Sequence, residues 1–156
     1  MPAGRDPDVV VREAAGDEEL AVRRVLDAAI LETDAVSDAV ARGNVLVAAT
    51  GRAGARGADG AVDDRVVGAL VLVPFDGVAL PEAIAAGVGM HVDAVAVRRR
   101  RRGRGVGRAL VAGALERERR LTVAFAPRVR AFYDALDFDV VAGASDDGRL
   151  WGEKSL

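Results

Sequence analysis

Glycines alternate with arginines near the middle of the chain. Gly103, Gly105 and Gly107 lie in a run that holds seven arginines between Arg98 and Arg108. Glycine lets a ligand approach the backbone closely, and arginine side chains bind ligands that carry several negative oxygens. The run follows an apolar stretch and leads into RALVAGAL, which is typical of a helix, and a helix N-terminus adds free N–H groups and a positive dipole end. The pattern therefore predicts an anion site, with diphosphate as its natural ligand.

Two common glycine loops do not fit this pattern. A P-loop ends in Gly-Lys-Ser or Gly-Lys-Thr, which the run lacks, and Arg108 stands where a dinucleotide-binding loop would have its third glycine. Binding to nucleic acid is a less favoured alternative for the Arg98–Arg108 patch, because these arginines are compact in sequence and no aromatic residue lies nearby to stack on bases. We expect Arg102, Arg104 and Arg108 to contact phosphate and Arg99–Arg101 to form a solvated edge.

His91 and Asp93 are the titratable residues of the apolar stretch MHVDAVAV. They are two residues apart, so in a regular strand both side chains project from one face, together with those of Val95 and Val97. A histidine has an ordinary pKa of about 6.5, which suits proton transfer near neutral pH. The alternative is that His91 only begins the strand, exposed or hydrogen-bonded, and that Asp93 caps a neighbouring backbone group.

The overall composition narrows the chemistry further. The 156 residues, of which 51% are hydrophobic, are enough for one globular domain, and we expect a single domain over residues 1–156. The chain has no cysteine and one histidine, so we expect no metal and no covalent cysteine intermediate. No apolar run approaches ~20 residues and the first residues do not resemble a signal peptide, which predicts a cytoplasmic protein with no membrane partner.

Hydrophobic periodicity predicts the elements that position these residues. After a first strand at residues 9–11, the first helix follows Gly16 and is expected to bury Leu20, Val25, Leu26, Ala29 and Ile30. A second helix, Thr33–Arg42, is capped by Thr33 and closed by Gly43. Later helices begin near Gly105 and at Pro127, and later strands are expected at Asn44–Thr50, Arg65–Val73, a central stretch ending at Val97, Leu121–Phe125, Val140–Ala142 and Arg149–Gly152. Between them, residues 51–64 are expected to form a mobile loop and Pro81–Ala86 a helical turn.

Two motifs and the order of these elements resemble one known family. Arg102–Gly107 matches the pattern R/Q-x-x-G-x-G/A after a strand, and Ala131–Phe138 resembles the signature A-x-F-Y-x-x-x-G-F on a later helix. On these motifs the chain resembles the GNAT superfamily of acyl-CoA N-acyltransferases. The resemblance implies a GNAT-type α/β fold, with a mixed, mostly antiparallel sheet of six to seven strands that splays after the fourth strand and is flanked by about four helices. Asp137 departs from the signature, which has glycine there, and we expect modest strain and no change of fold.

The same resemblance assigns roles to residues by position. It implies that the backbone of Val95 and Val97 pairs with the pantetheine arm of acetyl-CoA, and that the N–H of Val95 or Ala96 meets the oxyanion. It implies that the diphosphate binds to the loop residues Arg102, Gly103, Arg104, Gly105, Val106, Gly107 and Arg108. Tyr133 corresponds to the family's general acid, although an aromatic packed on the helix with its hydroxyl in water is the alternative. His91 and Asp93 correspond to strand positions that are catalytic or relay water in some members.

The resemblance implies transfer of an acetyl group from acetyl-CoA, as acyl-donor cosubstrate, directly to an amine. The acceptor, a small molecule or a peptide, is not identified by the sequence. A non-catalytic module that binds CoA is an alternative, because the general base is the least constant part of this chemistry. Many members of the family form dimers, so a homodimer is one option and the oligomeric state is open.

Overall fold

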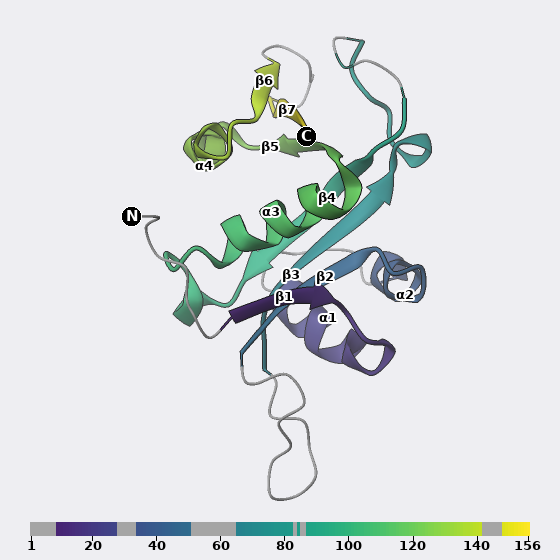
Figure 1. Cartoon of the computed structure of the whole chain (residues 1–156), viewed down its shortest axis with the longest axis vertical. Coiled ribbons are helices and arrows are strands. Elements are labelled where there is room, and N and C mark those ends of the chain that lie inside the picture. Colours follow the sequence, from purple (N-terminus) through teal and green to yellow (C-terminus); the bar gives the residue numbers. More distant parts are fainter. Residues whose placement is uncertain (1–8, 28–33, 51–64, 83, 85–86, 142–147) are drawn as a thin grey trace, which may run out of the picture. The chain divides into compact units, whose positions relative to one another are not determined.

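The computed structural model describes residues 9–27, 34–50, 65–82, 84, 87–141 and 148–156 (Figure 1). In these residues the helices are α1 (Glu19–Asp27), α2 (Asp34–Ala41), α3 (Val106–Glu118) and α4 (Arg130–Ala135). The strands are β1 (Val9–Glu13), β2 (Val45–Thr50), β3 (Arg65–Pro74), β4 (Met90–Val97), β5 (Arg120–Phe125), β6 (Asp139–Val141) and β7 (Leu150–Ser155). No helix in the described ranges is both long enough and apolar enough to cross a membrane.

The strands form one sheet in the order β1-β2-β3-β4-β5-β7-β6. The pairs β1–β2, β2–β3, β5–β7 and β6–β7 are antiparallel, whereas β4 and β5 are parallel. A mixed, mostly antiparallel sheet of seven strands with four α-helices is therefore confirmed. The β4–β5 ladder joins Met90–Val92 to Leu121–Val123, and β4 itself continues to Val97.

The chain divides into two compact units. Unit 1 comprises Met1–Val71 and Ala94–Gly113, and unit 2 comprises Leu72–Asp93 and Ala114–Leu156. In unit 1, α1 and α2 pack on one face of the strands, where their side chains form a core with Val45, Val47 and Ala69. The first turns of α3 pack on the other face, where a Cβ on Gly113 would lie 3.0 Å from Val11 (Figure 1).

Helix α1 is confirmed, but its buried face differs in one position from the expected one. Val22, Val25 and Leu26 are buried, whereas Leu20 is 61% exposed. Leu20 and Val22 are two residues apart, which turns their side chains about 200° from each other around the helix. Burial of Leu20 was therefore a wrong prediction, and the expected contacts of Ala29 and Ile30 lie outside the described residues.

Helix α2 ends at Ala41, one residue before the predicted end, and Gly43 closes it as predicted. Gly43 has φ of 74°, its N–H bonds the carbonyl of Val40, and the N–H of Asn44 bonds the carbonyl of Ala39. These two bonds form a Schellman motif, which needs a residue that accepts positive φ. The expected cap at Thr33 and the expected loop at 51–64 lie outside the described residues.

In unit 2, an aromatic ring packs closely against the backbone. A Cβ on Gly89 would lie 2.5 Å from the ring of Phe75, so a side chain at this position would force the ring to move. The guanidinium of Arg120 lies 5.0 Å from the centroid of the same ring and forms an ion pair of 2.5 Å with Glu153. These contacts tie β5 and β7 to the segment that precedes β4.

The helix expected from Pro127 begins with a short 3-10 turn at Pro127–Val129 and continues as α4. In the segment expected to hold a helical turn at Pro81–Ala86, the N–H of Ile84 bonds the carbonyl of Pro81, and residues 83, 85 and 86 lie outside the described part. The predicted hairpin is confirmed, because β6 and β7 pair in antiparallel register.

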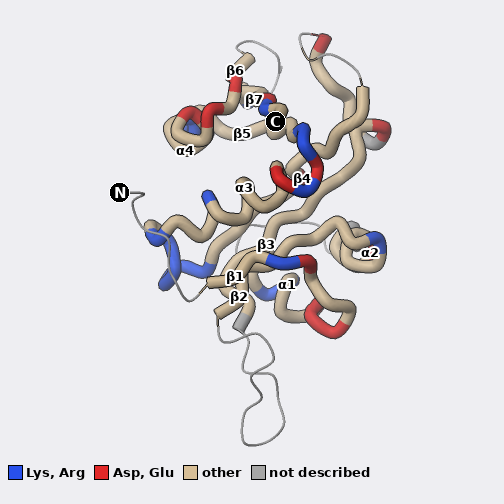
Figure 2. Tube along the Cα trace, in the orientation of Figure 1, with Lys and Arg blue, Asp and Glu red and all other residues tan. Residues whose placement is uncertain are grey.

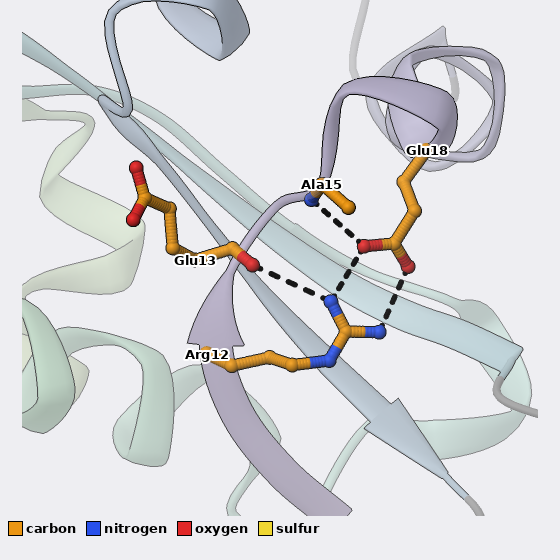
Figure 3. A network of polar contacts seen from close by, with 4 residues as sticks. All are labelled: Arg12, Glu13, Ala15 and Glu18. Atoms are coloured by element: carbon orange, nitrogen blue, oxygen red, sulfur yellow. Dashed lines mark hydrogen bonds and ion pairs between the residues drawn. The ribbon is translucent and has the colours of Figure 1, made fainter. Parts of the chain in front are cut away.

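An ion pair joins β1 to the turn that leads into α1 (Figure 3). The guanidinium of Arg12 makes two hydrogen bonds to the carboxylate of Glu18, at 2.5 and 2.9 Å. The same carboxylate accepts the backbone N–H of Ala15 at 2.9 Å. Together, and chiefly through the hydrogen bonds from Arg12, these contacts hold the pKa of Glu18 below its ordinary value.

Candidate active site

The glycine loop of unit 1 has the backbone geometry of an anion site. Gly103 and Gly105 have φ of 75° and 78°, in the left-handed region that favours glycine. A Cβ added to Gly103 would meet nothing within 4 Å, so the backbone there is open to a ligand. The first helical bond of α3 runs from the N–H of Ala109 to the carbonyl of Gly105, at 2.9 Å. The N–H groups of the helix's first turn therefore have no partner within the helix and point toward the loop.

Arginine positions, blue in Figure 2, lie along the trace of this loop. Arg104 and Arg108 are exposed. Arg102 is also exposed, but its Nε donates to the carbonyl of Val97 at 3.1 Å, so this side chain folds back on the end of β4. The backbone and the charges in unit 1 thus suit a ligand with several negative oxygens.

The end of β4 supplies the other candidate cofactor residues. Val95, Ala96 and Val97 are all half-buried. Gly68 on β3 lies close to this strand and to α3, because a Cβ there would lie 3.3 Å from the carbonyl oxygen of Ala96 and 3.0 Å from Val106. Gly68 therefore allows the first turn of α3 to approach the sheet. This role of Gly68 was not predicted from the sequence, although a lone glycine in an apolar strand is a known sign of close backbone approach.

His91 is buried in unit 2 and has a definite partner. Only 8% of the residue is exposed, and its Nδ1 lies 2.9 Å from the hydroxyl of Thr122, which is fully buried. The two residues are opposite each other in the β4–β5 ladder. The ring of Trp151 lies 5.1 Å from the imidazole, centroid to centroid. Thr122 and Trp151 were not predicted as neighbours of His91, because strand register brings them there.

Burial lowers the pKa of His91 below its ordinary value, and the charge of Asp93 partly opposes this effect. The carboxylate of Asp93 is thus near enough to act on the ring, although Asp93 itself is exposed. The lowered pKa of His91 favours the neutral imidazole. In a neutral imidazole one nitrogen carries the proton and the other has a free lone pair. The hydrogen bond that one nitrogen makes determines which of the two is protonated.

Tyr133 on α4 is enclosed by aromatic rings of unit 2. It is 4% exposed, stacks on Phe125 at 4.5 Å, and meets the edges or faces of Phe132 and Phe138 at 5.0 and 5.4 Å. Burial raises the pKa of Tyr133 to about 12. The phenol is therefore a hydrogen-bond donor throughout the physiological pH range. The alternative interpretation was that Tyr133 packs on the helix with its hydroxyl in water. The packing is present, but Tyr133 is far more buried than a side chain at the surface.

The end of α4 explains the motif that contains Tyr133. Asp137 has φ of 62°, its N–H bonds the carbonyl of Asp134, and the N–H of Phe138 bonds the carbonyl of Tyr133. These bonds form a second Schellman motif, in which Asp137 takes the left-handed position that glycine usually fills. Phe138 then contacts Tyr133, as residues at these two positions commonly do. The left-handed conformation expected for Asp137 is confirmed.

The candidate residues fall into two sets. His91, Asp93 and Tyr133 belong to unit 2, and the candidate cofactor residues of β4 and of the glycine loop belong to unit 1. Within unit 2, the structure brings Asp93 to His91, and Tyr133 to Phe125, Phe132 and Phe138.

A family model described as an acetyltransferase (GNAT) domain matches residues 41–140 of the chain. This range contains α3, α4 and all thirteen candidate site residues. No curated protein matches the sequence.

Solved structures share the fold at low sequence identity. A GNAT-family acetyltransferase from Streptococcus agalactiae 2603 has a TM-score of 0.65 at 12% identity, and the match covers 95% of each chain. An agmatine N-acetyltransferase matches with a TM-score of 0.65 at 16% identity, over 96% of this chain and 99% of the other. A chain of the NatC complex bound to Gag peptide and CoA matches with a TM-score of 0.65 at 12% identity, also over 96% and 99%.

Proposed function

Because the chain belongs to the GNAT acetyltransferase family, we propose that it transfers an acetyl group from acetyl-CoA directly to an amine. The observation that carries the proposal is the loop before α3, where Gly103 and Gly105 have positive φ and the backbone at Gly103 is open, beside the first N–H groups of the helix. That geometry fits a diphosphate, which acetyl-CoA contains. The thioester of acetyl-CoA supplies the activated acyl group.

In this proposal, residues of unit 1 bind the cosubstrate. The backbone from Arg102 to Arg108 holds the diphosphate, and the arginine side chains there neutralise its charge. The half-buried backbone of Val95, Ala96 and Val97 binds the pantetheine arm. An N–H of Val95 or Ala96 donates to the carbonyl oxygen on which negative charge develops, which is the usual way to stabilise such a charge.

We propose His91 as the base that receives the proton of the attacking amine. With Nδ1–H donating to the hydroxyl of Thr122, the lone pair is on Nε2. Because burial lowers the pKa of His91, this lone pair is available at neutral pH. In the proposed mechanism Thr122 is a positioning residue, since it acts through His91. Asp93 favours the protonated imidazole electrostatically once the proton has moved.

Tyr133 is the proposed hydrogen-bond donor to the departing sulfur. Its pKa of about 12 lies well above that of a thiol such as cysteine, about 8.5, so complete proton transfer to a free thiolate is uphill by roughly 5 kcal/mol. Donation of a hydrogen bond has no such cost and still stabilises the developing negative charge. The proton that finally neutralises the thiolate then comes from the amine, through His91 or water.

The proposed acceptor is an amine of a small molecule or a peptide. Proteins of the same fold include an agmatine N-acetyltransferase and a complex that binds a peptide together with CoA, which illustrates both classes. The proposal further places the protein in the cytoplasm, as one acetyltransferase domain over residues 1–156 that needs no metal.

One observation favours a second candidate, a module that binds CoA without catalysis. His91 and Tyr133 are only 8% and 4% exposed, so both candidate catalytic side chains lie largely within the protein. Turnover separates the two functions. Free thiol released from acetyl-CoA is measured over a panel of amines that includes agmatine, polyamines and peptides with free N-termini, and CoA affinity is measured by calorimetry. Binding with amine-dependent release supports the enzyme, binding without release supports the module, and no binding refutes both.

A matched pair of glycines tests the loop itself. Gly103 and Gly148 have φ of 75° and 82°, and a Cβ would meet nothing within 4 Å at either. Replacement by alanine therefore adds similar backbone strain, about 1 kcal/mol, at both positions. We expect Gly103→Ala to weaken CoA binding at least about tenfold, because the new methyl enters the space of the diphosphate, and Gly148→Ala to leave it unchanged. Equal CoA affinity in the two variants contradicts the assignment of the loop.

A further inference from the structure

Unit 1 contains a cavity that the proposed acetyl transfer does not use. Its volume is about 780 Å³, within the range of about 300–1,000 Å³ that is usual for small-molecule sites. It is bounded by α1, by the end of β2, by the beginning of β3 and by the turn that follows β4. Its described lining residues are Ala21, Arg24, Val25, Thr50, Val66, Val67, Arg98, Arg99, Arg100 and Arg101.

The charged residues in the described lining of this cavity all have the same sign. Five of the described lining residues are arginines, and no aspartate or glutamate is among them. Arg24 comes from α1, about 75 residues before the other four, so the fold adds a charge that the sequence run alone does not contain. Guanidinium groups gathered around one space repel one another, and a bound anion relieves that repulsion.

The turn after β4 presents its arginines from a fixed position. The N–H of Arg98 bonds the carbonyl of Val67 at 2.8 Å, and its Nε bonds the carbonyl of Val66 at 2.9 Å. The side-chain bond uses one of the five N–H donors of the guanidinium. A 3-10 turn over Arg99–Arg101 follows, closed by the bond from the N–H of Arg101 to the carbonyl of Arg98 at 2.8 Å. Arg98 is thus anchored to β3, and the turn that carries Arg99–Arg101 starts from this fixed point before any ligand binds, which lowers the entropy cost of binding.

This cavity is distinct from the diphosphate loop, because no residue from Arg102 to Arg108 is among its described lining residues. We infer that it is a second anion site, which binds a small molecule with two or more adjacent phosphate groups independently of acetyl-CoA. Clustered arginines suit such a ligand because each guanidinium can donate two parallel hydrogen bonds to one phosphate. The expectation that Arg99–Arg101 form only a solvated edge is therefore incomplete, since these residues line a basic cavity together with Arg24 and Arg98.

The probe for this site is inorganic tripolyphosphate, titrated by calorimetry at a constant ionic strength of about 0.15 M, where long-range attraction is screened. We expect binding of one equivalent in the cavity in the presence of saturating CoA, since CoA then occupies the diphosphate loop. Arg24→Gln and Arg99→Gln should each weaken this binding about tenfold, as expected for loss of a charge-assisted hydrogen bond. Both side chains are exposed, so the variants should fold, which circular dichroism checks.

Two control variants and two competitors make the test decisive. Arg128→Gln removes an exposed arginine elsewhere and should leave tripolyphosphate binding unchanged. Arg104→Gln should weaken CoA and leave tripolyphosphate binding in the presence of CoA unchanged. Absence of binding, displacement of tripolyphosphate by CoA, or equal weakening by Arg104→Gln or Arg128→Gln overturns the inference. Tighter binding of citrate overturns the phosphate class, and tighter binding of a short DNA duplex, lost in Arg24→Gln, shows a nucleic-acid surface instead. CoA affinity is measured separately, so failure here leaves the proposed acetyl transfer intact.

Discussion

Replacement of Thr122 by valine tests how His91 is held. Valine has nearly the shape of threonine but no hydroxyl, so Thr122→Val removes the partner of Nδ1 without opening a large cavity. Thr122 is fully buried and His91 is 8% exposed, so water does not readily replace the lost bond. Thr122→Ser is the matched control, because serine keeps the hydroxyl and loses only a methyl group.

The size of the effect follows from this burial. A buried polar group left without its partner costs about 1–3 kcal/mol. For a chain of 156 residues, a loss of about 2 kcal/mol lowers Tm by about 4–8 °C. Thr122→Ser should lose less, about 1 kcal/mol, for one deleted methyl group. The free energies of unfolding of Thr122→Val and Thr122→Ser therefore differ only slightly. The pKa of His91 distinguishes the two variants better.

The chain has a single histidine, so the imidazole signals in an NMR titration belong to His91 without ambiguity. In the wild-type protein we expect a pKa below about 6.5, since burial disfavours the charged ring. If Nδ1–H donates to the hydroxyl of Thr122, this hydrogen bond stabilises the charged imidazolium more than the neutral ring. Thr122→Val should then lower the pKa of His91 further, while Thr122→Ser should leave it near the wild-type value.

A rise of the pKa in Thr122→Val refutes this reasoning, because it shows that Thr122 donates to Nδ1 and that Nε2 carries the proton. The rate gives an independent check. If His91 is the base, kcat/KM of the wild-type enzyme falls in acid with the pKa of His91, and Thr122→Val lowers kcat about tenfold or more. If the fall of kcat/KM in acid does not follow the NMR titration of His91, then His91 is not the base.

Three further substitutions test other parts of the structure. Tyr133→Phe should lower kcat about 10- to 100-fold and leave the Kd for CoA unchanged, because a hydrogen bond to the developing thiolate acts only in the transition state; a wild-type kcat removes that role. Glu18→Gln should lower the free energy of unfolding in urea by up to about 1 kcal/mol at pH 7 and change it little near pH 2–3. The folded-state pKa of Glu18 is depressed, so the stabilisation by Arg12 is present above the unfolded pKa and is lost as pH falls through the folded pKa; an equal loss at both pH values contradicts this account. Asp137→Gly should raise Tm by about 1–2 °C, since relief of a left-handed residue, about 1–2 kcal/mol, exceeds the entropy that glycine adds to the unfolded chain, about 0.4–1 kcal/mol; a fall in Tm shows that Asp137 is not strained.

Much of the fold was predictable because its signals are local. The strands and helices follow the period of their apolar residues, and Gly43 and Asp137 occupy helix ends that require positive φ. The glycine loop was also predictable, since both its backbone conformation and its place before α3 depend on neighbouring residues. The wrong prediction that Leu20 is buried has a local cause too. In a short apolar sequence, more than one set of residues has the spacing of a buried helix face.

Other features depend on which distant segments the fold brings together. Register in the β4–β5 ladder places Thr122 opposite His91, and a shift by one residue would put a different side chain there. The close approach at Gly68 and the meeting of Arg24 with Arg98 depend on how α1, β3 and α3 pack, which no periodicity specifies. The sequence by itself determined the local backbone of the glycine loop before α3 and the types of residue available for chemistry. Only the tertiary structure decided which residue lies within hydrogen-bond distance of Nδ1 of His91 and which arginines share one cavity, because both depend on contacts between residues far apart in the chain.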